Sequence, residues 1–206
     1  MPADGMIVRK PENLTFEEAA AIPFGATTAY DFLINKGKLR AGERVLINGA
    51  SGSVGSACVQ IAKHFGAEVT GICSASNADL VRDIGADRVI DYNVEDFTKE
   101  GPQYDMVVDT VDTAPWDRAR HALVPNGRML LIAGSTSDMI LGWLKARLRG
   151  KRLIGGVASE SVDILRKAVD LAAAGDFHPV IDRSFDFSQI VAAPAHVDTC
   201  HQTRNV

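Results

Sequence analysis

The chain has 206 residues, of which 46% are hydrophobic, and a formal net charge of −4. That length suits one domain with a sizeable core, and the charge gives no electrostatic reason to expect nucleic acid or an anionic membrane as a partner. No apolar run is long enough to span a membrane, and the first residues do not form a secretory signal. Cys58, Cys73 and Cys200 form no C-x-x-C pair, which indicates a reducing compartment and predicts no disulfide framework and no metal site.

The first expected elements are helical and precede any strand. Thr15 followed by Glu18 is a capping-box pattern, which predicts a helical turn that Pro23 is expected to end. A second helix is expected over residues 27–36. Because a nucleotide-binding domain with its own boundary would begin near Leu39, residues 1–38 are interpreted as leader helices from a junction with something upstream.

The most informative segment is 44–65, which predicts a buried strand, a glycine turn and a helix in that order. The amides and the partial positive charge at a helix N-terminus suit a diphosphate. Gly52 would let the backbone approach that ligand, and Gly55 would let the helix pack close to the strand. Gly52, Ser53, Val54 and Gly55 are therefore predicted diphosphate-binding residues. Since Ala50 replaces the first glycine of the usual motif, an ordinary strand-to-helix turn explains the turn alone equally well, and only the flanking elements favour a nucleotide site.

Short runs rich in valine and isoleucine then alternate with helical stretches to the end of the chain. The expected strands are 44–48, 68–73, 88–91, 105–110, 128–133 and 152–157, and the further helices are 54–65, 77–84, 115–122, 138–149, 160–174 and 187–193. This alternation predicts an α/β fold with a doubly wound, parallel, six-stranded sheet of the Rossmann type and strand order 3-2-1-4-5-6. Residues 39–206 are thus expected to form a dinucleotide-binding domain.

The end of the second expected strand bears on the choice of nicotinamide cofactor. NAD sites usually carry Asp or Glu there, whereas residues 73–77 contain no acid. Ser74, Ser76 and Asn77 could donate hydrogen bonds to a 2′-phosphate, cap the next helix, or do both. Arg82 and Lys63 are candidate cations for that phosphate. We therefore predict NADP rather than NAD.

Other candidate ligand contacts follow later strands. Val111 comes after the fourth expected strand, and Ala133 and Gly134 close the fifth, so all three are predicted at the carboxyl edge where ligands bind, although strand-end turns would look the same. The five histidines share no metal or proton-relay spacing, so the catalytic residue is unknown from sequence. A short-chain dehydrogenase is excluded because no tyrosine is followed four residues later by lysine.

Several stretches resemble the medium-chain dehydrogenase/reductase superfamily, in its zinc-independent, quinone-oxidoreductase-like branch. The matching stretches, in order, are Lys10–Ala20, Thr28-Ala29 with Phe32-Leu33, Val45–Gly55, Gly85–Tyr92, Pro125–Arg128 and Pro179–Arg183. Members of that family carry an N-terminal catalytic β-domain and a final apolar strand, and the resemblance implies that both are missing here. Asp112 stands where relatives commonly have glycine.

The resemblance implies an NADP(H)-binding domain of an oxidoreductase that transfers hydride between nicotinamide and a small quinone, enone or other carbonyl. It implies that Thr28 lies close to the nicotinamide, although Thr28 could equally well cap or pack the helix from residue 27. It also implies that Cys73 borders the adenosine pocket and that Tyr92 borders the 2′-phosphate. It further implies a homodimer paired through strand 152–157 and a cytoplasmic protein without a metal. The alternative is a non-catalytic NADP(H)-binding module or redox sensor.

Overall fold

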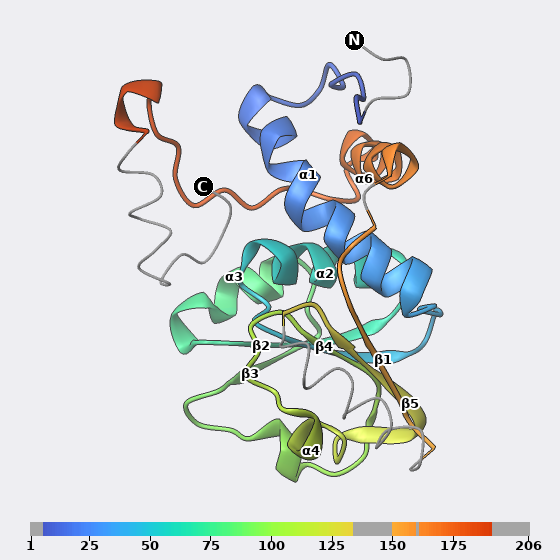
Figure 1. Cartoon of the computed structure of the whole chain (residues 1–206). Coiled ribbons are helices and arrows are strands. Elements are labelled where there is room, and N and C mark those ends of the chain that lie inside the picture. The colour runs from blue at the N-terminus through green and yellow to red at the C-terminus, as the bar shows by residue number, and fades with distance from the viewer. Residues whose placement is uncertain (1–5, 134–149, 160, 191–206) are drawn as a thin grey trace.

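The computed structural model describes residues 6–133, 150–159 and 161–190, and the structural statements below concern these residues. Six parallel strands form one sheet in the order β3-β2-β1-β4-β5-β6 (Figure 1). The strands are β1 (Arg44–Asn48), β2 (Glu68–Cys73), β3 (Arg88–Asp91), β4 (Tyr104–Asp109), β5 (Leu123–Leu131) and β6 (Arg152–Gly155). The α/β fold class and the expected strand order are therefore confirmed.

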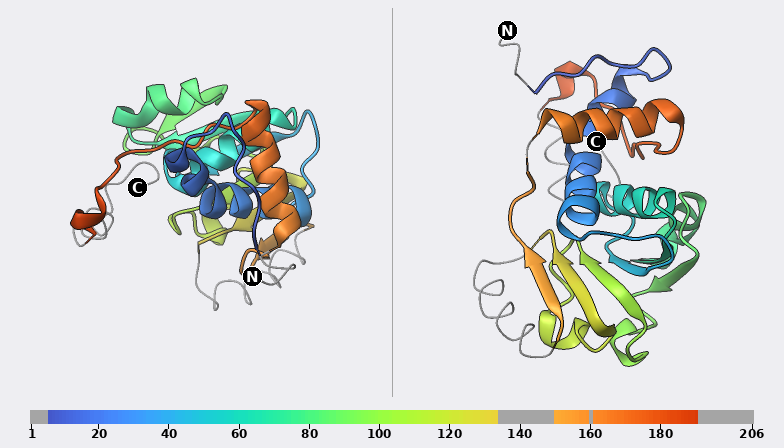
Figure 2. Two further views of the ribbon diagram at one scale, coloured as in Figure 1. Left: turned by 90° about the horizontal axis from the view of Figure 1, so that it is seen from above. Right: turned by 90° about the vertical axis from the view of Figure 1, so that its right-hand side faces the viewer.

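Helices cover both faces of this sheet. They are α1 (Phe16–Tyr30), the π-helix η1 (Asp31–Lys36), α2 (Ser53–His64), α3 (Ala78–Asp83), α4 (Trp116–Ala119) and α6 (Val162–Ala174), with short 3₁₀ segments η2 (Ala75–Asn77), η3 (Phe97–Lys99) and η4 (Phe187–Gln189). Figures 1 and 2 show α1, α2, α3 and α6 on one side of the sheet and α4 on the other. Along β1, Val45 and Ile47 pack into the core on the α2 side, whereas Leu46 packs into the core beside Trp116 of α4. Burial on both faces is why β1 reads as a continuous apolar run.

The later strands and helices differ from their predicted bounds. β5 starts five residues earlier than expected because Leu123 pairs with Tyr104 ahead of a register shift, and Asn126 takes a left-handed φ of 64° within that irregular stretch. β5 also ends earlier, since the amides of Ile132 and Ala133 both turn to the carbonyl of Asp109. The predicted helix at 138–149 lies outside the described residues, as does the end of the one at 187–193.

The prediction that Pro23 ends the first helical turn is wrong. One helix, α1, runs through Pro23 to Tyr30 and continues directly into η1. Pro23 lies on the exposed side of α1, where its missing amide is tolerated, while its neighbours Ile22 and Ala26 are fully buried. The hydroxyl of Thr27 donates to the carbonyl of Pro23. Packing of the buried side of α1 against α2 and α6 therefore outweighs the local helix-breaking tendency.

The residues before β1 belong to the same core as the sheet. Leu14, Ile22, Phe32 and Leu33 are buried in one cluster with Val45. Residues 6–38 are thus packed on the domain rather than set apart from it. A domain boundary at 38/39 stays a prediction.

A buried ion pair fastens the segment before β1 to β5. Arg128, only 4% exposed, meets the Glu43 carboxylate through two nitrogens at 3.0 and 2.5 Å. The same guanidinium donates to the carbonyls of Gly37 and Lys38. Burial raises the pKa of Glu43, but hydrogen bonds from Arg128 and from the Arg40 amide outweigh it and hold that pKa below its usual value. The pair closes the η1–β1 connection against the sheet.

Removing this guanidinium is expected to destabilise the fold. Arg128→Ala leaves a half-buried carboxylate unpaired, and we expect the free energy of unfolding in urea to fall by about 3 kcal/mol. Arg82→Ala, which breaks the exposed pair with Asp79, is the control and should cost less than about 0.5 kcal/mol. Because the folded-state pKa of Glu43 is lowered, its contribution is present above the unfolded pKa and is lost as pH falls. Equal losses of unfolding free energy in the two variants would contradict this role. So would a difference in unfolding free energy between wild type and Arg128→Ala that does not become smaller at acid pH.

Candidate dinucleotide-binding site

A cavity of about 750 Å³ opens at the carboxyl edge of the sheet, along the ends of β1 and β2 and beside the residues that follow β3 and β4. This is the edge where open parallel sheets bind ligands, next to the point where the strand order reverses. The predicted site residues that line it are Gly52, Cys73, Ser74, Asn77, Tyr92 and Val111. The structure thus gathers into one cavity residues from four separate loops.

The turn between β1 and α2 depends on two glycines. A Cβ on Gly55 would lie 2.0 Å from the carbonyl oxygen of Gly49, so only glycine lets α2 start this close to β1. Gly49 has a left-handed φ of 83°, and its Cβ would lie 2.6 Å from Val111. Ala50, at the position of the missing first glycine, is fully buried and packs toward Gly71 of β2. Glycine is therefore required at positions 49 and 55. The usual motif has its first glycine at the position of Ala50, so in this chain that glycine comes one residue earlier.

Gly52 is different, because the protein itself would accept a side chain there. The nearest atom to a Cβ on Gly52 is the Gly49 oxygen at 3.6 Å, an ordinary contact. Gly52 is also the N-cap of α2, provides no side-chain cap, and lines the cavity. The N-terminus of α2 is thereby presented to the cavity, where amides and helix dipole favour an anion.

The end of β2 carries a cluster of hydroxyl and amide groups. Ser74 Oγ lies 2.9 Å from Ser76 Oγ, and Asn77 Nδ2 donates to Ser74 Oγ at 3.1 Å and to Ser51 Oγ at 3.4 Å. The alternative interpretation, that Ser74 and Asn77 cap the next helix, is wrong, since neither side chain makes a capping bond. The cluster instead joins the β1–α2 turn to the β2–α3 turn along one wall of the cavity.

Cys73 ends β2 behind this cluster. It is 2% exposed, and burial together with the nearby Asp91 carboxylate raises the pKa of its thiol to about 11. Cys73 is therefore protonated at neutral pH and serves as a small apolar side chain rather than a nucleophile.

Neither cation suggested from sequence lines the cavity. Lys63 lies at the opposite end of α2, ten residues or about 15 Å from the helix start, and holds Asp87 at 2.8 Å. Arg82 pairs with Asp79 on the exposed side of α3. In the part of the chain that the structure describes, the cation that lines the cavity is Arg118 of α4, whose guanidinium meets Asp96 at 2.9 Å. Sequence reasoning missed Arg118. Its position in the helix that follows the fourth strand could have indicated that it lies near the carboxyl edge of the sheet.

A buried carboxylate shapes the loop after β4. Asp109, 1% exposed, accepts hydrogen bonds from Asn48 Nδ2 at 2.9 Å and from the amides of Val111 and Ala114 at 3.2 and 3.0 Å. These bonds hold Val111 at the cavity. Asp112, beside it, takes a left-handed φ of 55°, a conformation that glycine adopts most easily. Glycine at this position, as the family resemblance suggests for relatives, would adopt the same conformation at lower cost.

The other predicted site residues that the structure describes are not among those that line the cavity. Val54 packs against the core, and Ala133 is half-buried where its amide meets the carbonyl of Asp109. Ser53 begins α2 beside α1, the helix that carries Thr28. Gly134 lies outside the described residues.

A doubly wound parallel sheet with a glycine turn, an open helix N-terminus and a cavity at the switch point defines a dinucleotide-binding domain of the Rossmann type. The profile of a family described as "Zinc-binding dehydrogenase" matches residues 84–203, and the chain belongs to that family. The resemblance to the medium-chain, quinone-oxidoreductase-like dehydrogenases is thereby confirmed.

Individual relatives agree with this assignment. The chain is 32% identical to the zebrafish (Danio rerio) protein named NAD(P)H oxidoreductase RTN4IP1, mitochondrial, over 95% of its own length and 57% of the relative's. It is 31% identical to a tomato (Solanum lycopersicum) 2-methylene-furan-3-one reductase, over 98% and 49%. A quinone oxidoreductase structure from Coxiella burnetii superposes with a TM-score of 0.85 at 27% identity, covering 96% of this chain and 62% of that one. The chain spans about half the length of the curated relatives it matches.

The family description raises the question of zinc. Within residues 6–133, 150–159 and 161–190, no three His, Cys, Asp or Glu side chains lie close enough together to hold a metal ion. These residues therefore do not fit a zinc site, and the expected absence of a metal stays a prediction. Over the same residues, no helix is both long and apolar enough to cross a membrane.

Gly52→Val should separate binding from folding. A valine at this position meets little protein but fills the space in front of α2, so we expect near-native thermal stability and loss of dinucleotide binding by calorimetry. Gly55→Val is the contrasting variant, and it should fail to fold because its Cβ overlaps the Gly49 carbonyl. Full cofactor affinity in a folded Gly52→Val protein would show that the diphosphate does not bind at this turn.

Proposed function

We propose that the chain is the NADP(H)-binding domain of an oxidoreductase that transfers hydride between nicotinamide and a small quinone, enone or other carbonyl compound. The observation that carries this proposal is the uncapped N-terminus of α2, which opens on a cavity whose β2 wall bears hydroxyl and amide groups. The names of the relatives support it: one is an NAD(P)H oxidoreductase, and one from Arabidopsis thaliana is an NADPH-dependent alkenal/one oxidoreductase.

Each part of the cavity suits one part of the dinucleotide. The first amides of α2 bind the diphosphate without a side chain in the way, because the N-cap is Gly52. Ser74 and Asn77 donate to a phosphate on the adenosine ribose, with no carboxylate at the end of β2 to repel it. Tyr92 and Val111 provide the apolar surfaces on either side.

The bound nicotinamide would supply the hydride chemistry. The described residues of this chain position that group and keep the adenosine half in place. Asp109 acts through the loop it holds, because its oxygens bond backbone amides and Asn48. No acid or base in the described residues stands out as a proton donor to the substrate, and the catalytic residue stays unassigned.

We also propose that the protein is a homodimer paired through β6. Within the described sheet β6 is an edge strand, bonded to β5 alone, and pairing with a second copy would satisfy its outer backbone groups. The free, buried Cys58 and Cys73 suit a reducing compartment. A cytoplasmic location stays a prediction, since the zebrafish relative is named mitochondrial and the Arabidopsis relative chloroplastic.

Titration calorimetry with NADPH and NADH tests the cofactor assignment. We expect NADPH to bind at least tenfold more tightly, which corresponds to about 1.4 kcal/mol. Ser74→Asp places a carboxylate beside the 2′-phosphate and should abolish or invert that preference. Ser184→Asp, at an exposed position that does not line the cavity, is the matched control and should leave it unchanged. Equal affinities in the wild type, or a preference for NADH, would refute the assignment.

A further inference from the structure

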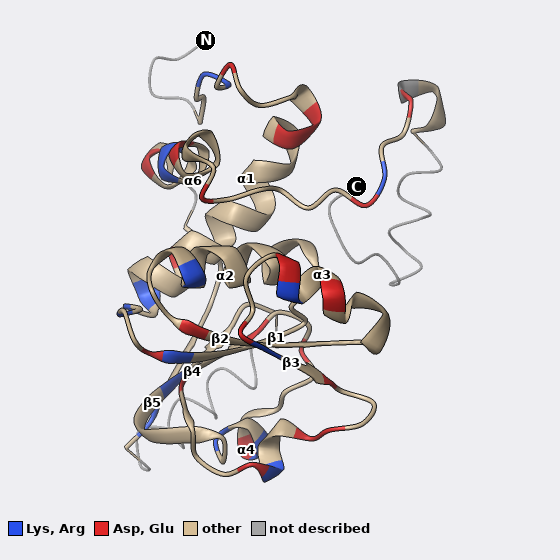
Figure 3. Cartoon of the chain, turned by 180° about the vertical axis from the view of Figure 1, so that it is seen from behind, with Lys and Arg blue, Asp and Glu red and all other residues tan. Residues whose placement is uncertain are grey.

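Phe24 is a large aromatic side chain left 71% exposed on α1. α1 carries no charged residue beyond Glu18, so the helix around Phe24 is uncharged, as the tan ribbon in Figure 3 shows. Single exposed hydrophobic side chains are common on proteins, so the position of Phe24, and not its exposure alone, bears on ligand binding.

The position of Phe24 relative to α2 is set by a close helix contact. A Cβ on the next residue, Gly25, would lie 2.8 Å from the carbonyl oxygen of Ser53, the first residue of α2. α1 therefore crosses α2 at the same end that opens on the cavity. Phe24 and Thr28 are four residues apart and share one face of α1, next to this crossing.

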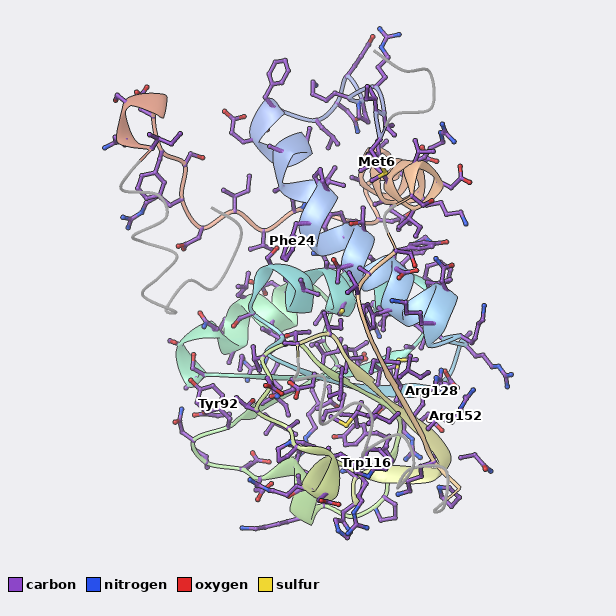
Figure 4. All side chains as sticks on the ribbon, in the orientation of Figure 1. Met6, Phe24, Tyr92, Trp116, Arg128 and Arg152 are labelled. Atoms are coloured by element: carbon purple, nitrogen blue, oxygen red, sulfur yellow. The ribbon has the colours of Figure 1, made fainter. Side chains whose placement is uncertain are left out.

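The direction of the bound dinucleotide follows from the order of the helices. Its adenosine half belongs beside Ser74 and Asn77, just before α3, and its diphosphate belongs at the N-terminus of α2. Figures 1 and 2 show α2 between α3 and α1. The nicotinamide half of the dinucleotide is thus directed toward α1. In Figure 4, Phe24 lies on α1, above α2, and Tyr92 lies lower on the left, directly after β3, which ends at Asp91.

We infer that Phe24 contacts the nicotinamide ring of the bound dinucleotide and is a cofactor-binding residue that holds this ring in place. This inference rests on the proposed function. A planar aromatic ring offers the nicotinamide an apolar, polarisable face, and the contact buries a side chain that is otherwise in water. Phe16 provides the comparison: it is 81% exposed on the same helix, but eight residues, or about 12 Å, further from the crossing.

The test compares two ligands that differ in the nicotinamide half. The full chain is titrated with NADP⁺ and with 2′,5′-ADP, which lacks the nicotinamide ring, its ribose and the phosphate attached to that ribose. We expect Phe24→Ala to weaken NADP⁺ binding at least fivefold and to leave 2′,5′-ADP binding unchanged. Phe24→Tyr, which keeps the ring, should restore NADP⁺ binding, and Phe16→Ala should change neither affinity. Thermal unfolding checks that every variant is folded.

Three results would overturn the inference, and they differ from failure of the proposed function. Unchanged NADP⁺ affinity in folded Phe24→Ala would show that the ring does not contact the nicotinamide. Equal weakening of both ligands would show that Phe24 acts by positioning α2. If Phe16→Ala and Phe24→Ala weakened NADP⁺ binding equally, the effect would come from the apolar character of α1 as a whole and not from a contact made by Phe24. Wild-type protein that binds neither ligand would instead refute the proposed function, and the inference with it.

Discussion

The approach of α2 to the turn after β1 is the contact on which the site depends. Gly55 allows it, because any Cβ there would overlap the carbonyl of Gly49. The approach places the start of α2 directly over the strand ends, where its amides and dipole are presented to the cavity. A larger residue at 55 would push the helix outward and remove the anion site even if the sheet survived. The binding chemistry is therefore a consequence of backbone packing.

Two polar networks hold segments at the two opposite edges of the sheet. On one side, Asp109 organises the loop after β4 through backbone amides and Asn48. At the opposite edge of the sheet, Arg128 and Glu43 fasten the segment leading into β1. Both networks are buried and hydrogen-bonded, so losing one partner would leave the other without compensation. The Asp109 network thus holds the loop after β4 at the cavity before any ligand binds, which reduces the ordering cost of binding.

The helix α1 packs beside the start of α2, next to the cofactor site. It packs on α2 and α6 through its buried side and leaves Phe16 and Phe24 exposed on the other. The relatives are about twice as long as the segment they share with this chain. A cofactor domain by itself carries the groups that bind and orient a dinucleotide, and this matches the described residues, which offer anion and apolar contacts but no evident proton donor.

Local pattern determined the sheet. β1, β2 and β3 match their predicted bounds because short apolar runs between turns leave little choice, and the alternation of strands with helices restricts the topology to right-handed crossovers. The lack of an acid at the end of β2, on which the NADP prediction rests, is likewise a fact of sequence. Only the tertiary structure decided that α1 continues through Pro23, because the buried neighbours of that proline are held by helices distant in the chain. Only the tertiary structure brought Arg118 to Asp96 at the cavity, since 22 residues separate them and their meeting depends on how α4 lies against the sheet.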